Sequence, residues 1–191
     1  MKKIAFILII FFGFQINLYA DPNRIFSGKN NAKIIIIAYE SLTCSHCADF
    51  HKNVYPQLKK DYLDTGLAKI EFRHFPLDIA AFNASKIAQC KKDQGLEILG
   101  SLYSNQQDWV KGSTVEQVNN NLKKFIEKSG YEIDFDKCIN NKDIEDYVLN
   151  DRIEGVKNFD VNATPTIIIN NKKFEKSLNY KNLKKSLEKL I

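Results

Sequence analysis

The chain has 191 residues, of which 44% are hydrophobic and 27% are charged, and its formal net charge is +5. This length suits one compact domain, with or without an insertion, and this composition is too apolar for a disordered chain. The three arginines, Arg24, Arg73 and Arg152, are scattered along the sequence, which argues against a nucleic-acid-binding surface.

The first 20 residues, MKKIAFILIIFFGFQINLYA, have the layout of a secretory signal peptide. A basic start precedes an apolar run from Ile4 to Phe14, which is shorter than the roughly 20 apolar residues of a membrane-spanning helix. Ala20 suits the last position before cleavage, but Leu18 is larger than the residue usually found two positions earlier. An uncleaved membrane anchor is the alternative. Both interpretations place the rest of the chain outside the cytosol, and the periplasm is the expected location.

A β-α-β unit is predicted after the leader. Residues 21–32 are polar and are interpreted as an irregular lead-in. The nearly continuous β-branched run over 33–39 predicts a strand buried on both faces, as in the middle of a sheet. The alternating segment 68–75 predicts a second strand. Between them, residues 45–64 predict a helix that Pro56 should kink, with an apolar face formed by Phe50, Val54, Leu58 and Tyr62.

The middle of the chain, from about Asn83 to Gly155, is predicted to be entirely helical. Ser113 and Glu116 match a capping box, in which a hydroxyl and a carboxylate three residues apart cap the start of a helix. Tyr103 and Trp109 are predicted to pack in the core. The predicted helices cover residues 84–92, 96–109, the segment from the capping box to Gly130, and 142–156.

Strand patterns return after this helical block. Residues 166–169 predict a strand, which Asn170 and Asn171 turn back into 172–174 as a hairpin. Residues 179–191 predict a final amphipathic helix, with an apolar side formed by Leu183, Leu187 and Leu190. The elements therefore run β-α-β, then helices, then β-β-α, which is the pattern of an α/β protein.

Four cysteines in an exported protein suggest disulfide bonds, and four allow three pairings. Cys44 and Cys47 form a C-x-x-C unit at the start of the first predicted helix, and such a pair readily closes on itself. This leaves Cys90 and Cys138, about 48 residues apart, as a candidate structural disulfide. Two buried thiols that never meet are the alternative.

The position of Cys44 at a helix start favours its ionised form. The first helical turn presents unpaired N–H groups and the positive end of the helix dipole, which stabilise a thiolate. His46, between the two cysteines, can add a hydrogen bond or a positive charge. A stabilised thiolate stabilises the reduced pair and makes the Cys44–Cys47 disulfide a stronger oxidant. Cys47, one turn inward, should be less exposed.

Three segments together resemble the bacterial DsbA-like thiol:disulfide oxidoreductases. They are Glu40–Cys47 (ESLTCSHC), Arg73–Asp78 (RHFPLD) and Ala163–Thr166 (ATPT). The resemblance covers nearly all of the chain after the leader and implies a thioredoxin fold with an inserted all-helical subdomain. The expected boundaries are a signal peptide over 1–20, the first half of the thioredoxin fold over 21–82, the helical insertion over 83–155 and the second half over 156–191.

The resemblance also implies roles for particular residues. Cys44 would be the catalytic nucleophile that forms a mixed disulfide, and Cys47 the partner that resolves it. Pro165 would be a cis-proline facing the active site, and Thr164 before it would offer backbone hydrogen bonds to an extended substrate segment. The implied substrates are unfolded or reduced exported proteins, with a membrane protein as the candidate reoxidant. No cofactor or metal is required, and the chain is expected to be a monomer.

Two positions depart from the family pattern. Ser45 stands between the cysteines where the family often has proline, and Ala38 stands six residues before Cys44 where the family often has a buried acid. Glu40 lies nearby but is interpreted as a solvated turn residue that points elsewhere. These departures leave proton transfer to Cys47, and the choice between oxidase and reductase, open.

Other functions fit parts of the pattern. A reductase or isomerase would share the C-x-x-C, although isomerases of this kind usually carry an added dimerisation domain. A copper or zinc carrier could use Cys44, Cys47 and His51, but His51 is expected to be an exposed helix residue and His74 a structural one. A secreted domain with two inert disulfides is the non-enzymatic alternative, although a Cys44–Cys47 disulfide, with only two residues between the cysteines, would stabilise the fold little.

Overall fold

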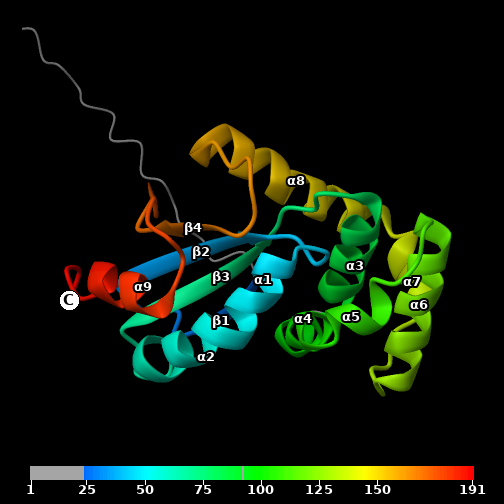
Figure 1. Cartoon of the computed structure of the whole chain (residues 1–191), viewed down its shortest axis with the longest axis horizontal. Helices are drawn as coiled ribbons and strands as arrows, with labels where there is room; N and C mark the ends of the chain where they lie inside the picture. The colour runs from blue at the N-terminus through cyan, green and yellow to red at the C-terminus, as the bar shows by residue number, and fades with distance from the viewer. Residues whose placement is uncertain (1–23, 92) are drawn as a thin grey trace, which may run out of the picture.

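A five-stranded mixed β-sheet organises the computed structural model, which describes residues 24–91 and 93–191 (Figure 1). The predicted signal peptide, residues 1–20, lies outside these described residues. The strands are β1 (Ile25–Gly28), β2 (Ile34–Glu40), β3 (Ala68–His74), β4 (Thr166–Ile169) and β5 (Lys172–Lys173). Their order is β1-β3-β2-β4-β5, with β2 parallel to β3 and antiparallel to β4.

Strand β2 occupies the middle of the sheet, which confirms the prediction from its apolar run. Ile36 and Ala38 are completely buried. Ile36 lies opposite Ile70 of β3 on one side and Ile169 of β4 on the other. β-branched side chains pack well on a pleated surface that is covered on both faces, so this run stabilises the centre of the sheet.

Strand β1 corrects the prediction of an irregular lead-in over residues 21–32. It pairs antiparallel with β3 at the edge of the sheet and buries Ile25 and Ser27. Gly28 ends the strand with a φ of 103°, and a Cβ there would lie only 2.6 Å from the carbonyl oxygen of Ala68. Only glycine allows both this conformation and this close approach of two backbones.

The first helical segment follows Cys44 and alternates α-helical and π-helical turns. It comprises α1 (Ser45–Asp49), η1 (Phe50–Val54), α2 (Tyr55–Leu58) and η2 (Lys59–Leu63). Pro56 cannot donate a backbone hydrogen bond, and the wider π turns lie on both sides of the α2 turn that contains it. The predicted apolar face is confirmed, since its members are at most 4% exposed: Phe50, Val54, Leu58 and Tyr62.

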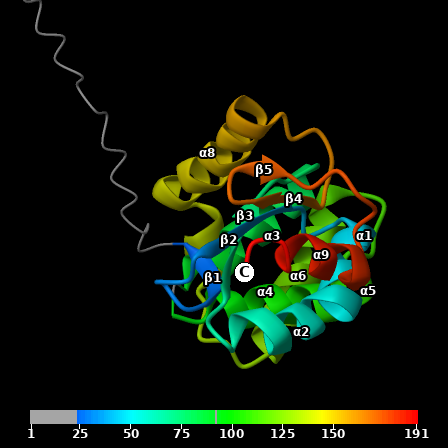
Figure 2. The ribbon, with the colours of Figure 1, turned by 90° about the vertical axis from the view of Figure 1, so that its left-hand side faces the viewer.

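Six helices of the described residues separate the two parts of the sheet along the chain. They are α3 (Ile79–Cys90), α4 (Gly95–Ser104), α5 (Gln106–Trp109), α6 (Val115–Lys128), α7 (Phe135–Ile139) and α8 (Lys142–Phe159). Helices α3 and α5–α7 lie beyond one end of the sheet (Figure 1). Helix α8 covers one face of the sheet, and α1 and α2 cover the other (Figure 2). The prediction that Tyr103 and Trp109 are core residues is confirmed, because they are 3% and 0% exposed.

Two helix starts differ from the prediction. Helix α3 begins at Ile79 rather than Ala84, because the Asp78 carboxylate accepts a hydrogen bond from the backbone N–H of Ala81 and caps it. Helix α6 is capped by Thr114 rather than Ser113, with the Thr114 hydroxyl accepting from the backbone N–H of Gln117.

The C-terminal hairpin and helix follow the predicted order. Asn170 and Asn171 have φ values of 45° and 64°, as the tight turn between β4 and β5 requires. Helix α9 spans Tyr180–Leu187, shorter than the predicted 179–191. Its Leu187 is completely buried, whereas Leu190 lies beyond the helix and is 46% exposed, so the predicted apolar side ends at Leu187. Within the described part of the chain, no helix is long and apolar enough to cross a membrane.

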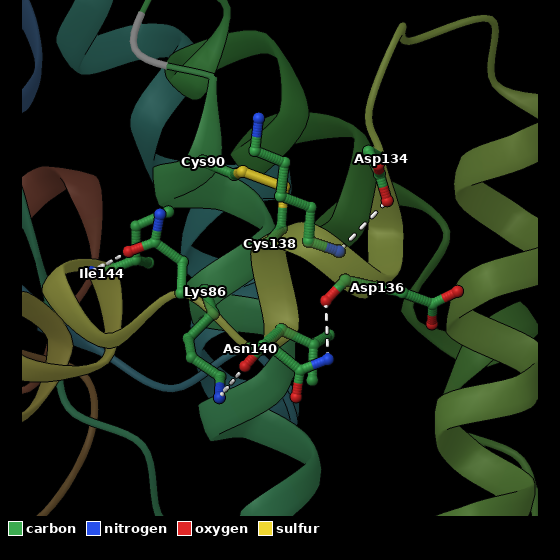
Figure 3. The surroundings of a disulfide bond; sticks show 10 residues. Lys86, Cys90, Asp134, Asp136, Cys138, Asn140 and Ile144 are labelled. Atoms are coloured by element: carbon green, nitrogen blue, oxygen red, sulfur yellow. Dashed lines mark hydrogen bonds between the residues drawn. A yellow bond between two sulfur atoms is a disulfide. The ribbon is translucent and has the colours of Figure 1, made fainter.

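A disulfide joins Cys90, at the end of α3, to Cys138 in α7 (Figure 3). It links residues 48 positions apart, with their Cα atoms 5.7 Å from each other. The ammonium group of Lys86, one turn before Cys90, donates a 2.5 Å hydrogen bond to the carbonyl of Ile139. The bridge and this hydrogen bond fix α7 against α3, away from Cys44 and Cys47.

Replacing both bridged cysteines, Cys90→Ala with Cys138→Ala, should lower the free energy of unfolding by about 2–4 kcal/mol, because the unfolded chain regains the entropy of the closed loop. Denaturant unfolding of the oxidised parent and the variant measures this change. The alkylation rate of Cys44 serves as the control and should not change. An equal unfolding midpoint in both proteins would contradict a stabilising role.

Candidate active site

Cys44 and Cys47 are free and lie at the amino end of the first helical segment. Cys44 is the N-cap residue, with extended backbone angles, and its carbonyl accepts hydrogen bonds from the backbone N–H groups of Cys47 and Ala48 at 3.2 Å each. The Cys44 side chain is half-buried, whereas Cys47 is completely buried. The helix start therefore presents one sulfur to solvent and keeps the other inside.

The surroundings of Cys44 favour its thiolate. A hydrogen bond from the Cys47 thiol lowers the pKa of Cys44 to about 5, against the opposing effect of burial. The backbone N–H groups of Cys47 and His46 add to the lowering. The His46 side chain itself is exposed, so the contribution of this residue comes from its backbone at the helix start.

The surroundings of Cys47 favour its neutral thiol. Burial raises the pKa of Cys47 far above its ordinary value, and the hydrogen bond to Cys44 and the negative charge of Glu40 raise it further. Two cysteines three residues apart thus have opposite acid strengths, because one meets the helix start and solvent while the other lies in the core.

The Thr164–Pro165 loop lies directly against Cys44. The Thr164–Pro165 peptide bond is cis, as the resemblance implies. The Cys44 Sγ lies 3.4 Å from the carbonyl oxygen of Thr164, although the two residues are 120 positions apart. Thr166, the first residue of β4, holds the other side of the loop, because its hydroxyl donates to the carbonyl of Ala163 at 2.7 Å.

The helical block contributes a residue that the sequence did not reveal. The side-chain amide of Gln106, in α5, donates hydrogen bonds to the carbonyls of Leu42 at 2.8 Å and Cys44 at 3.1 Å. Gln106 therefore fixes both ends of the short segment that carries Cys44. Nothing in its local sequence, between Asn105 and Gln107, distinguishes it from a surface glutamine.

The segment between β2 and Cys44 is held on its other side by the start of α3. The Thr43 hydroxyl donates to the Asp78 carboxylate at 2.7 Å, and the Ser41 hydroxyl accepts from the backbone N–H of Leu77 at 3.3 Å. Asp78 also caps α3, so the segments Glu40–Cys47 and Arg73–Asp78 form one hydrogen-bonded unit.

Glu40 and His51 overturn the sequence interpretation of both residues. Glu40 was expected to be solvated and His51 exposed, but their side chains are 3% and 7% exposed and form a hydrogen bond with a 2.8 Å Oε2–Nε2 distance. Glu40 is the last residue of β2, and His51 follows Cys47 by four residues on the same helical segment. The long-range pairing buries Glu40 and leaves only 7% of the His51 side chain exposed.

The histidines and acids of the described residues do not form a metal centre. No three of their histidine, cysteine, aspartate or glutamate side chains gather at a common point, including Cys44, Cys47 and His51. His74 is completely buried, its ring nitrogen is 3.2 Å from the side-chain oxygen of Gln89, and burial lowers its pKa. The metal-carrier interpretation therefore lacks a binding geometry, and the structural interpretation of His74 is supported.

Comparisons with known proteins agree with this geometry. A family model described as "Thioredoxin" matches residues 20–189. The crystal structure of Wolbachia pipientis alpha-DsbA1 is similar, with a TM-score of 0.80 and 30% identity over 91% of this chain and 93% of that one. A "Putative protein-disulfide oxidoreductase" of Rickettsia bellii is 35% identical over 80 residues, or 42% of this chain and about a third (31%) of that protein. "Disulfide bond formation protein D" of Bacillus subtilis is 24% identical over 181 residues, or 85% of this chain and 74% of that protein.

The thiolate of Cys44 should titrate with a midpoint near pH 5. The alkylation rate of Cys44 in the reduced protein, followed against pH by mass spectrometry, measures this midpoint. The depressed pKa stabilises the reduced fold fully above the ordinary value of 9.0, and this contribution is lost as the pH falls through about 5. A midpoint of an ordinary thiol would contradict the described geometry.

Gln106→Ala should destabilise the protein by about 1–3 kcal/mol, because it removes the side-chain donor to the carbonyl of Leu42 and one of the donors to the carbonyl of Cys44. Denaturant unfolding measures the change. Gln107→Ala is the matched control, since Gln107 is the exposed neighbour on the same helix. Equal effects of the two substitutions would show that the two hydrogen bonds contribute nothing specific.

Proposed function

The chain belongs to the thioredoxin family as a DsbA-like thiol:disulfide oxidoreductase, and we propose that it introduces or exchanges disulfide bonds in exported proteins through Cys44 and Cys47. The observation that carries the proposal is the unequal acidity of the two sulfurs. Cys44 is half-exposed with a pKa of about 5, and Cys47 is buried with a strongly raised pKa. Only one sulfur of the pair is both reachable and ionised near neutral pH.

The reaction starts from the Cys44–Cys47 disulfide. A substrate thiolate attacks the Cys44 Sγ, the bond between the two cysteines breaks, and the electron pair leaves on Cys47, which takes up a proton. A second substrate thiolate then attacks the substrate sulfur of the mixed disulfide, and Cys44 leaves as a thiolate. The substrate loses two electrons and gains a disulfide, and the pair on the enzyme gains the same two electrons.

The low pKa of Cys44 sets the favoured direction. A sulfur that is stable as a thiolate is a good leaving group in the last step, and its stability also favours the reduced pair over the disulfide. The pair therefore gives its disulfide away more readily than it accepts one. This supports an oxidase over a reductase.

The surface beside Cys44 suits an unfolded polypeptide. Thr164 and Pro165 offer backbone at the edge of the sulfur, to which an extended substrate segment can hydrogen-bond. A neighbouring cleft of about 540 Å³ lies between Thr43, the start of α3 and the start of α6. Ile79 and Val115 line it and are 60% and 41% exposed, which favours apolar side chains of a substrate.

An extracytoplasmic location completes the proposal. Residues 1–20 would direct export as a signal peptide, and the Cys90–Cys138 disulfide is of the kind that persists in oxidising compartments. The helical insertion over 83–155, between the two halves of the fold at 21–82 and 156–191, would support the active site. A membrane protein is the proposed class of reoxidant.

Cys44→Ser should abolish disulfide transfer. Cys47→Ser should instead accumulate mixed disulfides when it is mixed with a disulfide-bonded substrate, because its Cys44 thiolate attacks that bond, one substrate sulfur leaves as a thiolate, and no Cys47 remains to resolve the product. Reactivation of a reduced, unfolded test protein measures transfer, and non-reducing electrophoresis detects the mixed disulfides. Cys90→Ala with Cys138→Ala is the control for general loss of cysteines. The assignment would fail if both active-site variants oxidised the test protein as fast as the parent.

A further inference from the structure

Cys47 needs a proton partner that bulk water does not provide. In the proposed reaction Cys47 leaves as an anion when the pair is reduced and must lose a proton when the pair is oxidised again. The side chain is completely buried, so neither transfer occurs directly with solvent. The position of the family's acid on β2 holds Ala38, which carries no titratable group.

Glu40 brings a carboxylate to the same face of β2 as Ala38, one step closer to the cysteines, because residues two apart in a strand point the same way. Its negative charge acts on Cys47 and raises the pKa of that thiol. His51 lies four residues after Cys47 and hence on the same side of the helical segment. The 2.8 Å hydrogen bond between Glu40 and His51 therefore joins a carboxylate whose charge acts on Cys47 to a histidine one helical turn after Cys47.

Aromatic rings hold the imidazole of His51 in place. It stacks on Tyr103 of α4, with ring centres 4.2 Å apart and planes inclined by 22°, and contacts Phe72 of β3 and Tyr55 of α2. The titratable groups that face the pair from these elements are Cys44, Cys47, Tyr55 and Tyr103. Burial raises the pKa of both tyrosines, which leaves them neutral, and Glu40 raises the pKa of Tyr103 further.

His51 also reaches the surface. It lines a cleft of about 660 Å³ between α1 and the α4–α5 region, together with the exposed charged residues Asp49, Lys52 and Asp108. The imidazole thus has the buried carboxylate on one side and an open cleft on the other. A histidine hydrogen-bonded to a carboxylate can take up a proton at one ring nitrogen and release one at the other, which suits the movement of a proton between solvent and a buried site.

We infer that Glu40 and His51 form a proton relay between solvent and Cys47, an inference that rests on the proposed oxidoreductase function. When the Cys44–Cys47 bond breaks, Glu40 and His51 deliver one proton to the leaving Cys47 sulfur and regain one from the cleft. When Cys47 attacks a mixed disulfide at Cys44, the proton leaves by the same route. The relay moves only protons. The two electrons of the reaction come from the substrate thiols through thiol–disulfide exchange.

The test measures the reactions of Cys44 and Cys47 separately, by mixing the reduced protein with oxidised glutathione. Attack by Cys44 forms a glutathione adduct and releases one glutathione, and attack by Cys47 then closes the Cys44–Cys47 disulfide and releases the second. Acid quenching and mass spectrometry give both rates. Adduct formation depends on Cys44 alone, so its absence from the parent would refute the proposed function rather than the relay.

Glu40→Gln should leave adduct formation unchanged and slow ring closure by about 100-fold, the usual size of a general acid–base effect. Its ring closure should also rise about tenfold for each pH unit, since hydroxide replaces the lost base, whereas that of the parent should level off. Glu97→Gln is the matched control, because Glu97 is an exposed carboxylate on α4, and both of its rates should equal those of the parent.

His51→Ala should show the same slow ring closure and should be rescued by free imidazole, which can enter the cleft and replace the missing ring. A purely structural role would not produce this concentration-dependent rescue. The relay is refuted if ring closure in Glu40→Gln keeps the rate and pH profile of the parent, or if both steps slow equally. It is also refuted if imidazole leaves His51→Ala unchanged.

Discussion

The opposite acidities of the two active-site sulfurs are the constraint on which the chemistry of the site depends. The Cys47 thiol donates to Cys44, and this single contact lowers the pKa of one sulfur while it raises the pKa of the other. It works because the helix start places Cys44 at the surface and Cys47 one turn inside. The Thr164 loop, Gln106 and Asp78 all hold the segment that sets this geometry.

Much of the fold could be predicted because its signals are local. In β2 the β-branched run, and in the first helical segment the fourfold spacing of apolar residues, predict which side chains are buried from only a few neighbouring residues. Asn170 and Asn171 predict a hairpin turn in the same way. The reactive pair was also visible, since C-x-x-C at a helix start depends only on neighbouring residues.

What could not be predicted depends on residues far apart in the sequence. Strand β1 has only four residues, too few to show a strand pattern, and it exists because the edge of β3 offers it hydrogen bonds. Gln106 meets Cys44 from 62 positions away. Glu40 and His51 each resemble a surface residue locally, and only the packing of the first helical segment on the sheet hides them together. The reactive cysteines can therefore be predicted from the local sequence, whereas Gln106, Glu40 and His51 are brought to the site only by folding.

The antiparallel pairing of β2 with β4 has a consequence for how the site is kept intact. Tyr39 lies opposite Thr166, so the end of one strand that leads to Cys44 meets the beginning of the other that follows Pro165. A shift of two residues between these strands would part the sulfur from the proline loop by about 7 Å, and a shift of one would exchange the faces of the sheet on which Ile167, Ile168 and Ile169 pack. The pairing of the apolar strands β2 and β4 thus fixes the position of Cys44 relative to the Thr164–Pro165 loop.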